Sequence, residues 1–177
     1  EVELLGKRGV TVVHNINSNL KLASGYRFRY QELRDAGVNV CLGTDGAASS
    51  NNLDMREAMK TMAMLQKAWR VDPKAMPVDE LFRVATVNGA KALGIDAGRI
   101  EEGALADIVL IDTKNPEFHP NYNFLGNLIY SANSSCVNTV LIDGHVVMLD
   151  RKVEGEDEIL ENADRVAWKL MKLSKNI

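Results

Sequence analysis

The stretch that decides the fold of this chain reads Val38-Asn39-Val40-Cys41-Leu42-Gly43-Thr44-Asp45-Gly46. Its first five residues are mostly apolar and β-branched, which is typical of a strand buried in a parallel sheet. An earlier stretch, Val10-Thr11-Val12-Val13-His14, is built in the same way. Each run leads into a polar side chain, His14 or Asp45, and then a long polar segment. The two runs therefore predict parallel strands whose carboxyl ends share one rim, where such sheets bind ligands.

Helical patterns alternate with these two predicted strands. In the longest, Leu53–Arg70, apolar side chains recur at spacings of three and four residues, which predicts a helix with one buried face. Shorter helices are predicted at Glu1–Lys7, Arg29–Ala36, Val78–Val87 and Asn88–Leu93. Strand, polar segment and helix thus alternate along residues 1–94, which indicates parallel α/β units. We expect the polar segments at 15–25 and 46–52 to be loops.

The pattern changes after Gly98. An apolar run at Ala106–Asp112 predicts a strand, and two further runs, Val137–Ile142 and His145–Leu149, flank Asp143-Gly144. Asp-Gly is a strong signal for a two-residue hairpin, because both residues tolerate a positive φ. A loop is predicted at 116–122, a short helix at 124–131 and an amphipathic helix at 157–173. This half predicts an antiparallel sheet with helices.

Composition excludes several classes of protein. The chain has 177 residues, 46% of them hydrophobic, which is enough for one ordinary domain or for one domain plus a small appendage. Its net charge of -3 gives no basic surface for nucleic acid or anionic membranes. Its two cysteines exclude a disulfide scaffold and a four-cysteine zinc site. No apolar run reaches the roughly 20 residues of a membrane span, and no signal peptide is recognisable, so we expect a cytoplasmic location.

His14 and Asp45 are the residues most suited to chemistry, because both follow predicted strands at one rim. They could serve as metal ligands, or as a base and its partner. The alternative is that His14 hydrogen-bonds within a loop and Asp45 caps the turn at Gly46, and both interpretations stay open. The other histidines, His119 and His145, are expected at the surface. Cys41 and the methionine stripe Met55-Met59-Met62 are expected in the core.

Five segments, in order along the chain, resemble the amidohydrolase superfamily. The first is His14-Asn15-Ile16-Asn17-Ser18-Asn19-Leu20-Lys21-Leu22-Ala23-Ser24-Gly25. The others lie at 43–55, 85–94, 103–110 and 140–144. The chain is similar to the aminohydrolase and chlorohydrolase branch, which includes S-adenosylhomocysteine/methylthioadenosine deaminases, guanine deaminases and triazine hydrolases. The resemblance is specific for the superfamily and leaves the substrate open.

The resemblance implies a fold in which a (β/α)8 barrel, also called a TIM barrel, carries a small β-sandwich made from both chain ends. Residues 1–97 would be the last βα units of the barrel, with strands seven and eight at 10–13 and 38–42. Residues 98–153 would form the C-terminal share of the sandwich, and 154–177 a C-terminal helix. The fold class is therefore α/β, the C-terminal part of a barrel plus part of a second domain.

The resemblance also implies a function for Asp45. In the family, the aspartate after the last barrel strand binds the catalytic metal and takes a proton from the water that this metal activates. The expected cofactor is one divalent metal, zinc first and iron second. The expected reaction cleaves a C–N bond and deaminates a purine nucleoside-like or related N-heterocyclic substrate. His14, Ser18 and Asn19 are candidate substrate-binding residues.

The chain departs from the family in three ways. Ile16 stands where the family usually has proline, and Tyr26-Arg27-Phe28-Arg29-Tyr30 replaces the usual Ile-Ala-Pro. The His-x-His motif and the ligands of the fifth and sixth strands have no counterpart in this sequence, and a catalytic metal needs about three protein ligands. Because the chain also begins with Glu1 and not Met, we expect a C-terminal fragment that is inactive alone.

Further expectations concern the partners of such a fragment. The missing N-terminal segment would complete it, or the chain would self-associate through open strand edges, and the parent is expected to be a homo-oligomer. Apolar side chains of the two strands are expected to be bare without the rest of the barrel: Val10, Val12, Val38, Val40 and Leu42. The alternative function is a non-catalytic scaffold or regulatory module derived from the same fold.

Overall fold

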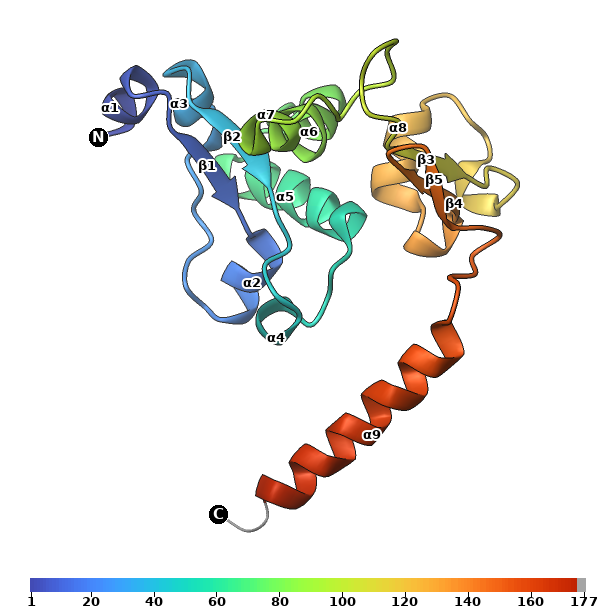
Figure 1. Ribbon diagram of the computed structural model, residues 1–177. Helices are drawn as coiled ribbons and strands as arrows, with labels where there is room; N and C mark the ends of the chain where they lie inside the picture. Colours follow the sequence, from blue (N-terminus) through green and yellow to red (C-terminus); the bar gives the residue numbers. More distant parts are fainter. Residues whose placement is uncertain (175–177) are drawn as a thin grey trace.

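Two parallel strands form the first sheet of the computed structural model, which describes residues 1–174. Strand β1 (Thr11–His14) pairs with β2 (Asn39–Leu42). Thr11 lies opposite Asn39 and His14 lies opposite Leu42, so both strands end at the same rim (Figure 1). The prediction of a parallel α/β unit is confirmed, and the chain as a whole is of mixed α/β type.

Helices of the N-terminal half cover this sheet. They are α1 (Val2–Lys7), α3 (Tyr30–Asp35), α5 (Met55–Arg70), α6 (Val78–Ala85) and α7 (Val87–Leu93). Helix α5 begins where the Asp54 side chain accepts a hydrogen bond from the backbone N–H of Glu57, a typical N-cap. It ends at Val71, whose left-handed backbone stops the helix. The predicted helices are therefore present, with ends shifted by one or two residues.

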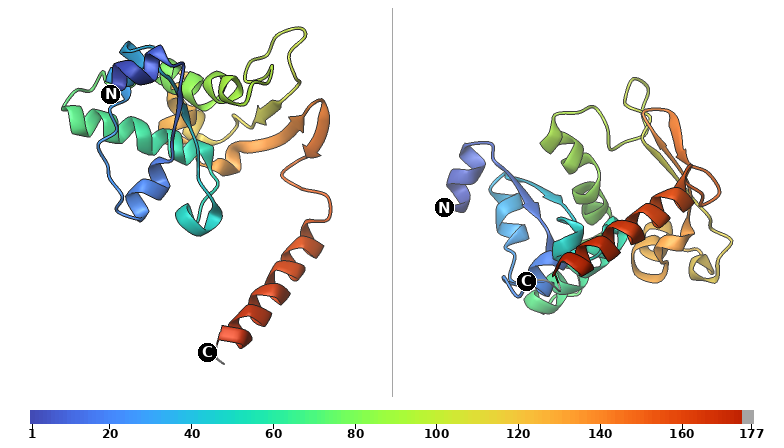
Figure 2. Two further views of the ribbon diagram at one scale, coloured as in Figure 1. Left: turned by 60° about the vertical axis from the view of Figure 1, so that its left-hand side comes forward. Right: turned by 60° about the horizontal axis from the view of Figure 1, so that its bottom comes forward.

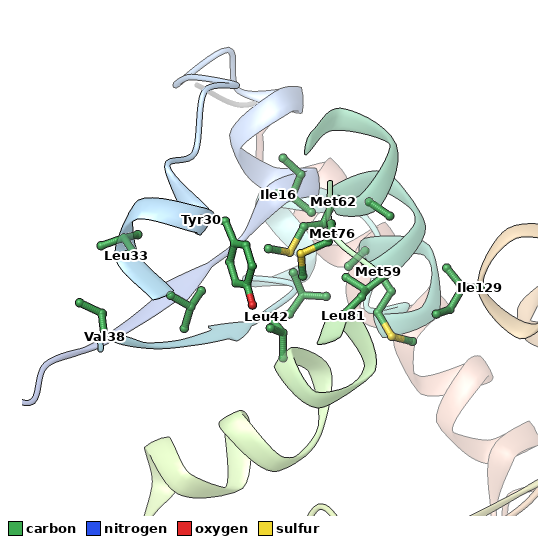
Figure 3. Close-up of a cluster of buried hydrophobic side chains, with 14 residues drawn as sticks. Ile16, Tyr30, Leu33, Val38, Leu42, Met59, Met62, Met76, Leu81 and Ile129 are labelled. Carbon is green, nitrogen blue, oxygen red and sulfur yellow. The ribbon is translucent and has the colours of Figure 1, made fainter. Parts of the chain in front are cut away.

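The core lies between β2 and helices α5 and α6. Figure 3 shows side chains from both layers meeting there, among them Leu42, Met59, Met62 and Leu81. Met62 and Leu81 are 0% exposed. The stripe of methionines on α5 is therefore core, as predicted. Cys41 is also buried, and burial raises the pKa of its thiol, so it is an unreactive packing residue.

One expectation about the strands is wrong in part. Val10 is 37% exposed, as expected, but Val38, Val40 and Leu42 are buried although the described residues contain only two strands of this sheet. They lie on the face that helices of the same chain cover, so no other strand is needed to shield them. Val13 instead is 53% exposed, on the opposite face of β1. The uncovered apolar surface of the two strands is therefore smaller than the sequence suggested, and at β1 it includes Val13 on the opposite face.

Two segments predicted as loops contain short helices. Helix α2 (Ile16–Lys21) follows β1, and α4 (Ala47–Ser50) follows β2. Ile16 is 0% exposed and belongs to the core, so tertiary packing stabilises α2 where local propensity is weak. Both helices lie at the carboxyl ends of the strands (Figure 1), which is the rim where function was expected.

The C-terminal half contains an antiparallel sheet, as predicted. Its strands are β3 (Ile108–Ile111), β4 (Val137–Ile142) and β5 (His145–Met148), in the order β3-β4-β5. Asp143 and Gly144 both have positive φ values, 48° and 77°, which confirms the hairpin turn. Between β3 and β4 the chain forms 3₁₀ turns at Pro116–Phe118 and Ser134–Cys136, helix α8 (Phe124–Gly126) and a π-helical turn at Asn127–Ser131.

Helix α9 (Glu156–Ser174) confirms the predicted C-terminal helix over the described residues, and 175–177 lie outside them. It has no buried residue and extends away from the rest of the chain in Figure 1 and in the left view of Figure 2. Apolar side chains such as Trp168 and Leu170 are 63% and 60% exposed. Within residues 1–174 no helix is both long and apolar enough to cross a membrane.

Candidate functional site

Asp45 is the best-prepared polar side chain at the strand rim. It lies three residues beyond β2, in the left-handed backbone region with φ 62°. Its Oδ2 accepts a hydrogen bond of 2.7 Å from the Ser18 hydroxyl, and its Oδ1 accepts one of 2.7 Å from the backbone N–H of Gly46. Both carboxylate oxygens are thus oriented by donors while the residue itself is exposed.

These hydrogen bonds also set the charge of Asp45. The Ser18 hydroxyl and the Gly46 N–H, with a smaller contribution from Ser49, hold the pKa of the carboxyl below its ordinary value. Asp45 is therefore ionised at neutral pH, and each oxygen retains a free lone pair. Such a group can bind a cation or accept a proton.

Helix α2 brings the other candidate residues to this rim. Ser18 is 3% exposed, and its hydroxyl points at Asp45. Asn19 donates from its side-chain amide to the hydroxyl of Ser24, at 3.1 Å, within its own segment. Lys21 donates to the side chain of Asn51, which ties α2 to the end of α4. The structure therefore joins Ser18 to Asp45, and leaves Asn19 in a local contact.

His14 occupies a different environment from Asp45. It is 5% exposed, and its ring stacks on Phe28 with centroids 3.8 Å apart and planes at 11°. Strand alternation places it on the same face as Val12, which packs on the core. Among residues 1–174, its Nδ1 has no hydrogen-bond partner. Burial lowers the pKa of His14 to about 4, so the imidazole is neutral at neutral pH.

Gln66 supports this stack, and sequence reasoning missed it. It is 2% exposed, and its side-chain amide donates to the backbone carbonyl of Phe28 at 2.8 Å. The buried amide thereby fixes the segment that carries the Phe28 ring over His14. One signal could have indicated this role: Gln66 lies four residues after Met62, so it is a polar residue within the apolar stripe of α5.

Asn15 is a second residue that the sequence did not single out. A Cβ atom at Gly43 would lie 2.3 Å from Asn15 Oδ1 and 3.1 Å from a Val13 methyl. The Asn15 amide therefore lies across the start of the segment that leads from β2 to Asp45, and a side chain at position 43 would displace it. The available signal was its place directly after a buried strand.

The described residues do not form a complete metal site. Within residues 1–174 no group of three or more His, Cys, Asp or Glu side chains could hold a metal ion. At the strand rim Asp45 has the chemistry of a ligand, because its carboxylate is ionised, exposed and oriented. The donor set therefore fits one ligand position of a divalent metal, and the other positions would need residues from outside this part of the chain.

Curated relatives of the chain are nucleoside deaminases. The chain is 48% identical over 173 residues to 5-methylthioadenosine/S-adenosylhomocysteine deaminase 1 of Archaeoglobus fulgidus, covering 96% of this chain and 41% of that protein. It is 47% identical over 172 residues to a 5'-deoxyadenosine deaminase of Methanoregula boonei, covering 97% of this chain and 39% of that protein. The chain thus spans about two-fifths of the length of these relatives.

Two solved structures of similar proteins superpose well on this chain. An adenosine deaminase from Xanthomonas campestris with bound zinc superposes with a TM-score of 0.87 at 39% identity, over 95% of this chain and 38% of that one. An atrazine chlorohydrolase from Arthrobacter aurescens, complexed with zinc, superposes with a TM-score of 0.85 at 26% identity, over 93% of this chain and 37% of that one. Both belong to the branch that the sequence resembles.

A comparison with family profiles points to the same group of proteins as these pairwise comparisons. The profile described as the amidohydrolase family matches residues 1–147, from α1 to β5. The expected family is confirmed: the chain belongs to the amidohydrolase family.

Proposed function

We propose that the protein containing this chain is a metal-dependent hydrolase that deaminates an adenosine-like nucleoside, and that the chain supplies its C-terminal part. The observation that carries this proposal is the ionised Asp45 carboxylate, held by Ser18 and Gly46 at the rim of a parallel sheet. Relatives at 48% and 47% identity are named as deaminases of methylthioadenosine, S-adenosylhomocysteine and 5'-deoxyadenosine.

In this proposal β1 and β2 are the last two strands of a (β/α)8 barrel, and residues 1–97 form its final βα units. The two-stranded sheet supports this placement, because each of its strands has an open edge within the described residues. The antiparallel sheet at 98–153 would be the C-terminal share of a small sandwich. The helix from residue 154 onward would be a separate C-terminal element.

The proposed chemistry assigns Asp45 two tasks. It would hold one divalent metal, with zinc as first choice because zinc is bound in two solved relatives, and with iron as the alternative. When bound, such a metal activates water for attack on the ring carbon that carries the amino group. Because Asp45 is ionised at neutral pH, one of its carboxylate oxygens can take up a proton. His14, Ser18 and Asn19 remain candidate substrate-binding residues.

The test uses the whole zinc-loaded protein with adenosine, 5'-deoxyadenosine, 5-methylthioadenosine and S-adenosylhomocysteine, and measures released ammonia. We expect turnover of at least one nucleoside. Asp45→Asn should lower kcat by about a thousandfold or more, because it removes the ligand charge and the proton acceptor. The fold should persist, since Asp45 is exposed and asparagine can still accept the hydrogen bond from Ser18. Asp79→Asn, at an exposed position of α6, is the control.

Two results would contradict the proposal. Near-normal turnover by Asp45→Asn would remove Asp45 from the catalytic machinery. An unsubstituted protein that binds zinc and deaminates none of these nucleosides would favour the non-catalytic scaffold or regulatory module.

We also propose a cytoplasmic location, which the two buried free cysteines support because reducing compartments keep thiols unpaired. A tagged copy located in cells would test it.

A further inference from the structure

We propose that Ser18 is a positioning residue that fixes the carboxylate of Asp45, an inference that rests on the proposed function. The geometry that carries it is one short hydrogen bond between two segments 27 residues apart. Ser18 Oγ donates to Asp45 Oδ2 at 2.7 Å. A hydroxyl bound to a carboxylate is among the stronger hydrogen bonds in proteins, because the acceptor is charged.

The hydroxyl has little freedom to do anything else. Ser18 is 3% exposed, so its side chain is held in place by its surroundings. A hydroxyl carries a single proton, and here that proton is directed at Asp45. Donating to a substrate would require breaking this charge-assisted bond and would take away one of the two donors that hold the Asp45 carboxylate. The geometry thus favours action through Asp45 over direct contact with substrate.

Two donors from different segments together define the plane of the carboxylate. Ser18 from α2 holds Oδ2, and the backbone N–H of Gly46, at the start of α4, holds Oδ1. Without Ser18 the carboxylate would keep the Gly46 donor and the smaller contribution of Ser49, and it would be less firmly oriented. The left-handed backbone of Asp45, with φ 62°, is uncommon for a residue with a side chain, so the position needs support from its neighbours.

Helix α2 provides this support. It interrupts a segment that the sequence predicts as loop, and it is anchored at both ends. Ile16 is 0% exposed in the core, and Lys21 bonds to Asn51 beyond α4. Ser18 lies between these two anchors and faces Asp45. The helix therefore holds its hydroxyl at a fixed point beside the rim, as a positioning role requires.

The experiment compares Ser18→Ala, Ser18→Thr and the control Ser131→Ala in the whole protein. We expect Ser18→Ala to lower kcat by about tenfold to a hundredfold with KM changed by less than about threefold, the usual effect of losing a hydrogen bond to a ligand side chain. Zinc retention against a chelator should fall by a similar factor. Ser18→Thr keeps the hydroxyl and should recover most of both. Ser131 is exposed in the π-helical turn of the C-terminal half, so Ser131→Ala should change neither.

Several outcomes would overturn the inference. A raised KM with unchanged kcat would make Ser18 a substrate contact, and unchanged kcat and zinc retention would leave it no role. A thermal stability lost equally in Ser18→Ala and Ser18→Thr would make its role purely structural. The proposed function fails separately, if the unsubstituted protein deaminates no nucleoside. In that case zinc retention still decides: a Ser18→Ala protein that holds zinc as well as the unsubstituted one overturns the inference.

Discussion

At the scale of single residues, the buried imidazole of His14 makes folding depend on pH. Burial lowers its pKa from the model-peptide value of 6.5 to about 4. Between these two values the unfolded chain binds a proton that the folded chain excludes. The contribution of a neutral His14 to stability is therefore complete above pH 6.5, and it is lost progressively as the pH falls towards 4.

This linkage gives a measurable prediction for the whole protein. The free energy of unfolding should fall by about 1.3 kcal/mol between pH 7.5 and pH 5.5 because of His14 alone. His14→Phe keeps an aromatic ring against Phe28 but cannot titrate, so it should remove this part of the pH dependence. His145→Gln, at an exposed position, should leave it in place. An equal slope in His14→Phe and the unsubstituted protein would refute the assignment.

His14 also marks the limit of what the sequence could predict about the site. The sequence pattern predicted that His14 and Asp45 lie at the carboxyl ends of two strands, and both do. The sequence did not settle which face of the strand His14 would take, because the helices that cover one face come from distant segments. The stack with Phe28 and the bond between Ser18 and Asp45 are likewise long-range contacts, which no local pattern encodes.

At the scale of helices and strands, two glycines test how closely the helices pack. A Cβ atom at Gly6 in α1 would lie 1.9 Å from the backbone oxygen of Ala36, at the end of α3. Gly6→Ala would push α1 away from α3 and should cost about 1–3 kcal/mol of unfolding free energy. Gly89 in α7 meets nothing within 4 Å, so Gly89→Ala should gain about 0.5–1 kcal/mol from helix propensity.

Denaturant unfolding of both variants checks this pair of predictions. The two substitutions add the same methyl group to a helix, so propensity favours alanine in both. Opposite signs of the stability change would therefore report the contact between α1 and α3. If Gly6→Ala were as stable as Gly89→Ala, the close approach of α1 to Ala36 would not exist in solution.

The helices themselves differ in how far local sequence determines them. Helix α5 could be predicted because its apolar spacing, its Asp54 cap and its sixteen residues all favour one structure. Helix α2 could not, since Asn15, Asn17, Ser18 and Asn19 favour turns and caps over helix interiors. What makes it helical is the burial of Ile16 in a core assembled from α5 and α6, which depends on the complete fold.

At the scale of the whole molecule, the chain combines a well-covered core with large uncovered apolar surfaces. The cluster around Met62 and Leu81 is closed. Outside it, Val13 on β1 and Val109 on β3 are 53% and 52% exposed. Helix α9 adds more, with no buried residue along its length. On one face of α9, Ile159, Val166 and Leu170 are 59%, 50% and 60% exposed. Because monomeric proteins rarely leave such an apolar face uncovered, we expect it to be covered in the native protein.

The uncovered apolar side chains matter most for the 177-residue chain expressed alone. We expect it to self-associate at micromolar concentration, because several half-exposed apolar side chains cost several kcal/mol at about 25 cal/mol per Å², against a total domain stability of about 5–15 kcal/mol. Light scattering should give a mass above that of one chain. Leu170→Glu, on the apolar side of α9, should reduce the association, whereas Lys169→Glu, on its polar side, should not.

The same preparation should also lack deaminase activity when zinc is added, because Asp45 is the one oriented ligand that the described residues offer. Adding the N-terminal remainder of the parent protein should lower the scattering mass and restore ammonia release together. That remainder would supply both the missing metal ligands and the surfaces that cover the exposed apolar faces. A compact, heat-stable monomer would contradict the argument, because the exposed faces of β1, β3 and α9 would then need no partner. Turnover by the isolated chain would also contradict the argument, because a single carboxylate would then be enough for catalysis.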